Sequence, residues 1–88
     1  MPTVDFFTRA GCHLCDDALA VVERVRSDVA FTLHIIDIDS DAELRALYDW
    51  EVPVIAVDGR KHAKFRLDEE AFRRRLAASA EHGLGDEA

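Results

Sequence analysis

The spacing of hydrophobic residues changes along the chain, and each spacing predicts a different element. A run of apolar and β-branched residues predicts a strand over residues 2–8. After a loop at Thr8–Gly11, apolar side chains recur at steps of three and four, which predicts an amphipathic helix from Cys12 to Asp28. The apolar face of that helix consists of Leu14, Ala18, Val21, Val22, Val25 and Val29.

The second apolar stretch, residues 31–38, is denser and predicts a strand that is buried on both faces of a parallel sheet. Ser40 followed by Glu43 matches a capping box, which predicts that a second helix starts there. This helix should end before Pro53, because a residue that precedes proline disfavours the α conformation. Its predicted buried face consists of Leu44, Leu47 and Tyr48. Core packing is the default expectation for Trp50, and lining the site just before the proline segment is the alternative.

The remaining sequence predicts a β-hairpin followed by a helix. Residues 53–57 form the third predicted strand, and Asp58-Gly59 is a strong two-residue hairpin signal. The fourth strand, residues 61–66, carries lysine and arginine as an edge strand does. Asp68 is the predicted cap of the last helix, and Gly83 is its predicted end. Leu67 and Phe72 occupy the staple positions around this cap.

The predicted order is β-α-β-α-β-β-α, an α/β fold. The first βαβ unit should have parallel strands and a right-handed crossover, whereas the hairpin is antiparallel. A mixed four-stranded sheet with helices on both faces accommodates this order. We expect one domain over residues 1–82 and a frayed tail over residues 83–88.

Composition and charge narrow the function classes. The 88 residues are 49% hydrophobic and 33% charged, which is typical of one small globular domain. The net charge of −7 argues against nonspecific binding to nucleic acid or to an anionic membrane. No apolar run is long enough to span a bilayer, and the N-terminus lacks the pattern of a signal peptide. We therefore expect a cytoplasmic monomer.

Cys12 and Cys15 form a C-x-x-C motif where the first strand meets the first helix. In a cytosolic βαβ protein this motif indicates thiol redox chemistry. Unpaired N–H groups and the dipole at the helix start stabilise a thiolate, which lowers the pKa of such a cysteine. Cys12 should therefore attack a disulfide and form a mixed disulfide, and Cys15 should then release the reduced partner.

Charged neighbours of the motif could tune this chemistry. Arg9 lies three residues before Cys12 and could add positive potential, whereas Asp16 and Asp17 oppose it. His13 titrates near neutrality, so it could make the redox potential depend on pH, and a solvent-facing spacer is an equal alternative.

The segment Thr8-Arg9-Ala10-Gly11-Cys12-His13-Leu14-Cys15 resembles the active-site segment of glutaredoxin-like proteins of the thioredoxin fold. Val52-Pro53-Val54 resembles the cis-proline segment of that fold, and Val57-Asp58-Gly59 resembles its hairpin turn. The resemblance covers residues 2–80. It implies a thioredoxin-like fold, a cis Pro53 that faces the cysteines, and substrate binding by the backbone of Val52. It also implies electron transfer in cell redox homeostasis, with Cys12 and Cys15 catalytic and with Arg9, His13, Val52 and Pro53 in contact with substrate.

The chain departs from glutaredoxins in two places. His13 and Leu14 stand where these proteins usually have proline and an aromatic residue. Residues 63–68 lack the glycine pair that helps to hold glutathione, and a backbone with side chains approaches a ligand less closely. We expect no bound cofactor and a disulfide-containing protein or a small thiol as substrate. Glutathione is an open candidate as co-substrate, with the missing glycine pair against it.

Two other function classes stay open. Two copies of the chain could share a metal ion or an iron–sulfur cluster through their C-x-x-C motifs, although one chain lacks the four ligands of a structural zinc site. His34 lies within a predicted strand and is interpreted as a sheet residue. Alternatively, the fold could be a redox-inactive interaction module. Residues 60–75 hold seven bases and three acids, which indicates either a solvated face or a patch that docks an acidic partner.

Overall fold

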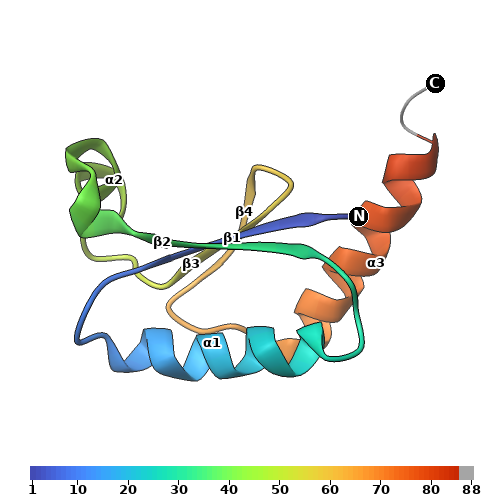
Figure 1. Ribbon diagram of the computed structural model, residues 1–88, viewed down its shortest axis with the longest axis horizontal. Coiled ribbons are helices and arrows are strands. Elements are labelled where there is room, and N and C mark those ends of the chain that lie inside the picture. Colours follow the sequence, from blue (N-terminus) through green and yellow to red (C-terminus); the bar gives the residue numbers. More distant parts are fainter. Residues whose placement is uncertain (86–88) are drawn as a thin grey trace.

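The computed structural model describes the backbone of residues 1–85 and the side chains of residues 1–79. Figure 1 shows a central sheet with α1 and α3 on one side and α2 on the other. The order β-α-β-α-β-β-α is therefore confirmed, with one additional short 3₁₀ helix before α2. The elements are β1 (Thr3–Thr8), α1 (His13–Arg26), β2 (Thr32–Asp37), η1 (Ile38–Ser40), α2 (Ala42–Tyr48), β3 (Val54–Val57), β4 (Arg60–Lys64) and α3 (Glu69–Gly85).

The sheet has the strand order β2-β1-β3-β4. β1 pairs parallel with β2, and the two remaining strand pairs are antiparallel. Because side chains alternate along a strand, β1 directs Phe6 to one face of the sheet and Phe7 to the other. Phe6 belongs to the larger core cluster, which α1 and α3 cover, and Phe7 belongs to the smaller cluster on the α2 side.

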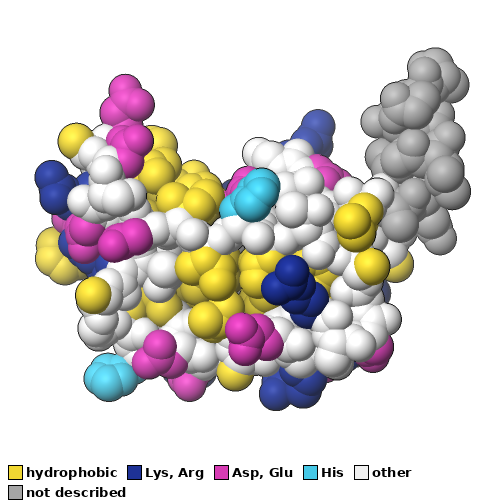
Figure 2. All heavy atoms as spheres, viewed as in Figure 1, with side chains coloured by type: hydrophobic (Ala, Val, Ile, Leu, Met, Phe, Trp, Pro, Cys, Tyr) yellow, Lys and Arg dark blue, Asp and Glu magenta, His cyan; other side chains and the backbone are white. Residues whose placement is uncertain are grey.

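β2 is an edge strand, so the prediction that it is buried on both faces is wrong. Its residues are half-buried or exposed, and Ile35 is 53% exposed. The dense apolar run predicted a central strand, but the strand order leaves only one neighbour for β2. Figure 2 shows hydrophobic side chains at the surface along β2 and α1, which is where this edge meets solvent.

α2 begins one residue later than predicted. Residues 38–40 form η1, capped by Asp37, so Ser40 is not the cap of α2. The cap is Asp41, whose Oδ1 accepts hydrogen bonds from the N–H groups of Glu43 (2.8 Å) and Leu44 (3.4 Å). The capping box predicted at Ser40 is therefore wrong, because Ser40 belongs to the 3₁₀ helix η1 and the next residue, Asp41, caps α2.

The buried face predicted for α2 is correct only in part. Leu44 and Tyr48 are half-buried against the smaller cluster, and the Tyr48 ring lies 4.8 Å from that of Phe7. Leu47 is 64% exposed and Trp50 is 84% exposed, so Trp50 does not pack in the core. A short helix over one end of the sheet can bury only one side of itself.

The hairpin and the last cap form as predicted. Asp58 and Gly59 both have positive φ, at 52° and 84°, as a two-residue hairpin turn requires. Asp68 Oδ2 accepts the N–H of Ala71 at 2.8 Å, and the staple residues Leu67 and Phe72 are both buried. α3 continues to Gly85, so the end predicted at Gly83 is wrong. The tail predicted beyond it falls partly on residues 86–88, outside the described residues.

Candidate functional site

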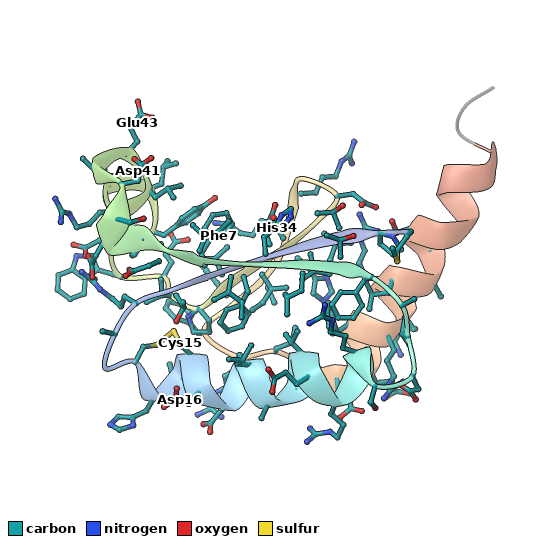
Figure 3. All side chains as sticks on the ribbon, viewed as in Figure 1. Phe7, Cys15, Asp16, His34, Asp41 and Glu43 are labelled. Carbon is teal, nitrogen blue, oxygen red and sulfur yellow. A yellow bond between two sulfur atoms is a disulfide. The ribbon has the colours of Figure 1, made fainter. Side chains whose placement is uncertain are left out.

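The two cysteines lie at the N-terminus of α1, as predicted, and are joined by a disulfide. Cys12 is the N-cap residue, with φ −94° and ψ 106°, and its Sγ accepts the N–H of Cys15 at 3.1 Å. Cys12 is half-buried, whereas Cys15 is only 3% exposed and belongs to the larger core cluster. In Figure 3 the disulfide stands at the start of α1 on the side that faces the sheet, while Asp16 points away from the sheet. Cys12 Sγ is therefore the sulfur that a partner can reach first.

Gly11 turns the chain from β1 into this cap. Its φ is +79°, a conformation that is strained for residues with a side chain. A Cβ added at Gly11 would meet no atom within 4 Å, so the backbone conformation, and not crowding, explains the glycine. The turn lets Cys12 take extended dihedral angles immediately before the first helical residue, His13.

The Val52–Pro53 peptide bond is cis, which confirms the implication of the family resemblance. Pro53 is fully buried, and its carbonyl oxygen accepts the N–H of Phe65 at 3.0 Å. The Val52 carbonyl oxygen lies 4.0 Å from Cys12 Sγ. The structure thus brings Val52 together with the cysteine pair, although 40 residues separate Val52 from Cys12 in the chain.

Arg9 binds two carboxylates. Its Nη2 lies 2.8 Å from Asp39 Oδ1, and its Nη1 lies 2.6 Å from Asp49 Oδ1. Hydrogen bonds from Arg9 to Asp49, which has the larger effect, and to Asp39 hold the pKa of the Arg9 guanidinium above its usual value. The positive charge of Arg9 is therefore compensated locally, and its predicted contact with substrate stays a prediction.

His13 is exposed as the first residue of α1, which fits either of its two interpretations. Asp16 is exposed in the first turn of α1, and its N–H donates to the Cys12 carbonyl oxygen at 3.2 Å. A carboxylate in this turn interacts favourably with the helix dipole but opposes a second negative charge at Cys12. Asp17 is turned towards a small cavity beside α1.

This cavity has a volume of about 120 Å³ and lies between α1 and the segment that joins β4 to α3. The chain reverses at Phe65, which has φ +70°, and the N–H of Arg66 donates to the Lys64 carbonyl oxygen at 2.8 Å. β4 therefore ends at Lys64, so the predicted end at Arg66 is wrong. Sequence reasoning missed this turn because phenylalanine is not a residue that favours positive φ. The lining residues are Leu14, Asp17, Ala18, Val21, Phe65, Arg66 and Leu67.

Carboxylates partly neutralise the basic stretch 60–75. Lys61 Nζ lies 2.9 Å from Glu51 Oε1, and Arg74 pairs with Glu70. Arg73 contacts Asp28 and Glu69. These contacts fit the interpretation of a solvated face, and the docking of an acidic partner stays a prediction.

Two further properties bear on the alternative functions. Within the part of the chain that the structure describes, no three side chains of His, Cys, Asp or Glu stand close enough together to hold a metal ion. His34 is an exposed residue of β2, as predicted, and its Nδ1 lies 3.1 Å from Asp5 Oδ1. None of the described helices is both long and apolar enough to cross a membrane.

Comparison with known proteins agrees with this geometry. The sequence model of one protein family, the glutaredoxin-like domain (DUF836), matches residues 3–77. The uncharacterized protein Rv0508 of Mycobacterium tuberculosis is 34% identical over 83 residues, covering 89% of this chain and 86% of that protein. Protein Ne2328 from Nitrosomonas europaea, solved by NMR, superposes with a TM-score of 0.74 at 27% identity, covering 85% of this chain and 91% of its own.

A mutant thioredoxin from Halobacterium salinarum superposes with a TM-score of 0.67, covering 88% of this chain and 73% of its own. At 22% identity this similarity shows the fold alone, which is thioredoxin-like. Together, the family match, the fold and the cysteine pair at the start of α1 lead to one conclusion: the chain belongs to the glutaredoxin-like domain family and has a thioredoxin-like fold.

Proposed function

We propose that this protein is a thiol–disulfide oxidoreductase that uses Cys12 as the attacking residue and Cys15 as the resolving residue. One observation carries the proposal: Cys12 Sγ is the N-cap of α1, accepts the N–H of Cys15 at 3.1 Å and is half-exposed, while Cys15 is buried. Hydrogen bonding and the helix dipole at this position favour the thiolate of Cys12 over its thiol.

The reaction starts from the dithiol form. The Cys12 thiolate attacks a substrate disulfide, so that one S–S bond breaks, a mixed S–S bond forms, and the leaving sulfur takes up a proton. The Cys15 thiolate then attacks Cys12 Sγ and releases the second substrate sulfur as a thiol. Two electrons have moved to the substrate, and the protein holds the Cys12–Cys15 disulfide. A dithiol or thiol reductant must restore the dithiol for a second turnover.

The backbone of Val52 is suited to hold the substrate during the first step. Its carbonyl oxygen lies 4.0 Å from Cys12 Sγ, so a peptide that pairs with Val52 would present its own sulfur at short range. We assign substrate contact to Val52 and Pro53, and also to Arg9 and His13, as the family resemblance implies. A disulfide-bonded protein or a small thiol in the cytoplasm is the proposed partner.

Glutathione remains open as the co-substrate. In the stretch that lacks the glycine pair, Phe65 takes a positive φ without being glycine. The backbone can thus turn here as a glycine would, but the Phe65 side chain stays 42% exposed beside the cavity. A thiol tripeptide would have to bind around this ring.

Variants of the two cysteines test the proposal. Purified protein should reduce a disulfide-bonded protein, and Cys12→Ser should abolish this activity. Cys15→Ala should accumulate a mixed disulfide at Cys12, which mass spectrometry identifies together with the trapped partner. Alanine is preferred over serine here because Cys15 is buried, and a buried hydroxyl without a partner costs about 1–3 kcal/mol.

Turnover, metal content and partner capture separate the proposal from its alternatives. Equal turnover by wild type and Cys12→Ser would refute the proposal. A coloured or metal-containing dimer after anaerobic purification would instead support a shared metal or cluster. Capture of the native partner by a Cys12→Ala/Cys15→Ala double variant would support an interaction module.

A further inference from the structure

Arg9 joins three segments that surround the cysteine motif. It lies in the loop between β1 and Cys12, where its side chain is 28% exposed. Its Nε and Nη2 donate to the two carboxylate oxygens of Asp39, at 3.3 and 2.8 Å. Its Nη1 donates to both the side-chain Oδ1 and the carbonyl oxygen of Asp49, at 2.6 and 2.9 Å. A planar fork with fixed directions makes these bonds, and a lysine cannot reproduce them.

Two carboxylates surround this one guanidinium, so the cluster has no positive charge to offer the sulfur. Hydrogen bonds to Asp49 and Asp39 hold the pKa of Arg9 above its usual value, so its guanidinium is charged in both pairs. An electrostatic effect of Arg9 on Cys12 is therefore offset by the acids it binds. Besides any contact with substrate, the four hydrogen bonds of Arg9 fix where the chain lies.

Two contacts join the loop before α1 to the segment after α2, and together we call them the frame. One is the Arg9–Asp49 pair, and the other is the approach of Cys12 Sγ to the Val52 carbonyl oxygen. Cys12 lies three positions after Arg9 on one segment, and Val52 lies three positions after Asp49 on the other. Asp49 follows directly after α2, so the contact sets the starting point of the chain that leads to the Val52–Pro53 bond.

The same segment is anchored from its other side. Glu51 Oε1 lies 2.9 Å from Lys61 Nζ, and Glu51 Oε2 lies 3.9 Å from Lys64 Nζ on β4. Trp50, between the two anchors, is 84% exposed and adds no packing. Val52 itself is half-buried against both core clusters, so polar contacts at Asp49 and Glu51 act together with this packing to place the Val52 carbonyl.

We propose that Arg9 is a positioning residue, which holds the Val52 segment at working distance from Cys12 through Asp49 and Asp39. This inference rests on the proposed function. Loss of the fork lets the segment drift from the sulfur, which weakens the docking of a substrate peptide before the first exchange. Arg9→Lys separates position from charge, because lysine keeps the positive charge and loses the fork.

The test compares Arg9→Met and Arg9→Lys with Arg24→Met as matched control. Arg24 also bonds a carboxylate, Glu69 Oε1 at 2.8 Å, but far along α1 from the motif. With a disulfide-bonded protein such as insulin as substrate, KM should rise about ten-fold in Arg9→Met, because a displacement of roughly 1 Å can cost up to about a hundred-fold. KM should rise in Arg9→Lys as well, because lysine loses the fork, and the pH profile of Cys12 alkylation should stay in place in this variant because the charge is kept.

Two results would overturn the inference. One is an unchanged KM in Arg9→Met. The other is a KM that Arg9→Lys restores to the wild-type value, since charge and not position would then be the cause. Arg9→Lys keeps the test usable if thermal melting reveals that Arg9→Met is unfolded.

Failure of the proposed function itself would be recognised separately. If wild type reduces no disulfide, amide hydrogen exchange in the disulfide form still reports on the frame without any turnover. The N–H of Glu51, which donates to the Tyr48 carbonyl oxygen at 2.9 Å, should exchange faster in Arg9→Met than in Arg24→Met. Equal exchange in the two variants would contradict the positioning role.

Discussion

Reduction of the Cys12–Cys15 disulfide should make the free energy of unfolding depend on pH in a way that the oxidised form does not share. The disulfide closes a very short loop, with a sequence separation of 3. The chain-entropy relation gives about 2 kcal/mol of stabilisation for such a loop. The oxidised form should therefore be the more stable one at acidic pH, where both thiols are protonated.

The thiolate of Cys12 reverses part of this difference as the pH rises. Hydrogen bonds to a charged group contribute about 1.5–3 kcal/mol, and the helix end contributes up to about 2 kcal/mol in partly buried positions. The N–H of Cys15, 3.1 Å from Cys12 Sγ, supplies the first of these. Both stabilise the folded thiolate and lower the pKa of Cys12 below that of an unfolded cysteine, which is about 8.5.

The direction of the effect follows from proton binding. Between the folded and the unfolded pKa of Cys12, the unfolded chain holds a proton that the folded chain has released, so stability rises with pH. The slope is about 1.4 kcal/mol per pH unit in this window. The difference in stability between the oxidised and the reduced form should therefore shrink as the pH rises towards about 8.5, the pKa of an unfolded cysteine.

Urea denaturation of both forms at several pH values measures this difference. The subtraction removes every titrating group except the two thiols, which only the reduced form has, and the Cys15→Ala variant separates Cys12 from Cys15. Cys15→Ala should retain the pH dependence of the reduced protein, and Cys12→Ser should lose it. A difference that stays constant across the window would refute the idea that the start of α1 stabilises a thiolate at Cys12.

Three other predictions test particular elements. Trp50→Ala should change the free energy of unfolding by less than about 0.5 kcal/mol in chemical denaturation, because Trp50 is 84% exposed, and a large loss would mean that it packs in the core. Asp41→Ala should cost about 1 kcal/mol by removing the α2 cap, and Ser40→Ala should cost less; the reverse order in denaturant titrations would restore the capping box at Ser40. Burial, with a smaller effect of Arg75, lowers the pKa of His62 below 6.5, so stability should fall as the pH drops below that value, and His62→Gln should flatten this fall in urea titrations.

Local signals in the sequence predicted those parts of the site whose cause lies within a few residues. Cys12 and Cys15 needed only the strand–helix junction around them, and the hairpin needed only Asp58 and Gly59. The Asp68 cap likewise depends on an N–H three residues away. In each case the residue that imposes the conformation and the group that it satisfies are neighbours in the chain.

The cis Pro53 was a different kind of prediction. The residues around it favour a trans bond on general grounds, and only the family resemblance implied the cis form that the structure has. Its distance to the cysteine pair, 4.0 Å from the Val52 carbonyl oxygen to Cys12 Sγ, could not be obtained from local propensity.

The sequence by itself determined the order of elements and the place of the cysteine pair at a helix start, because periodicity and capping act over one or two turns. Only the tertiary structure decided that β2 is an edge strand, that Trp50 faces solvent and that Arg9 binds acids 30 and 40 residues away. These properties depend on which strand has one neighbour and which loops meet at one end of the sheet. Such meetings are set by chain topology, and no pattern within a single segment records them.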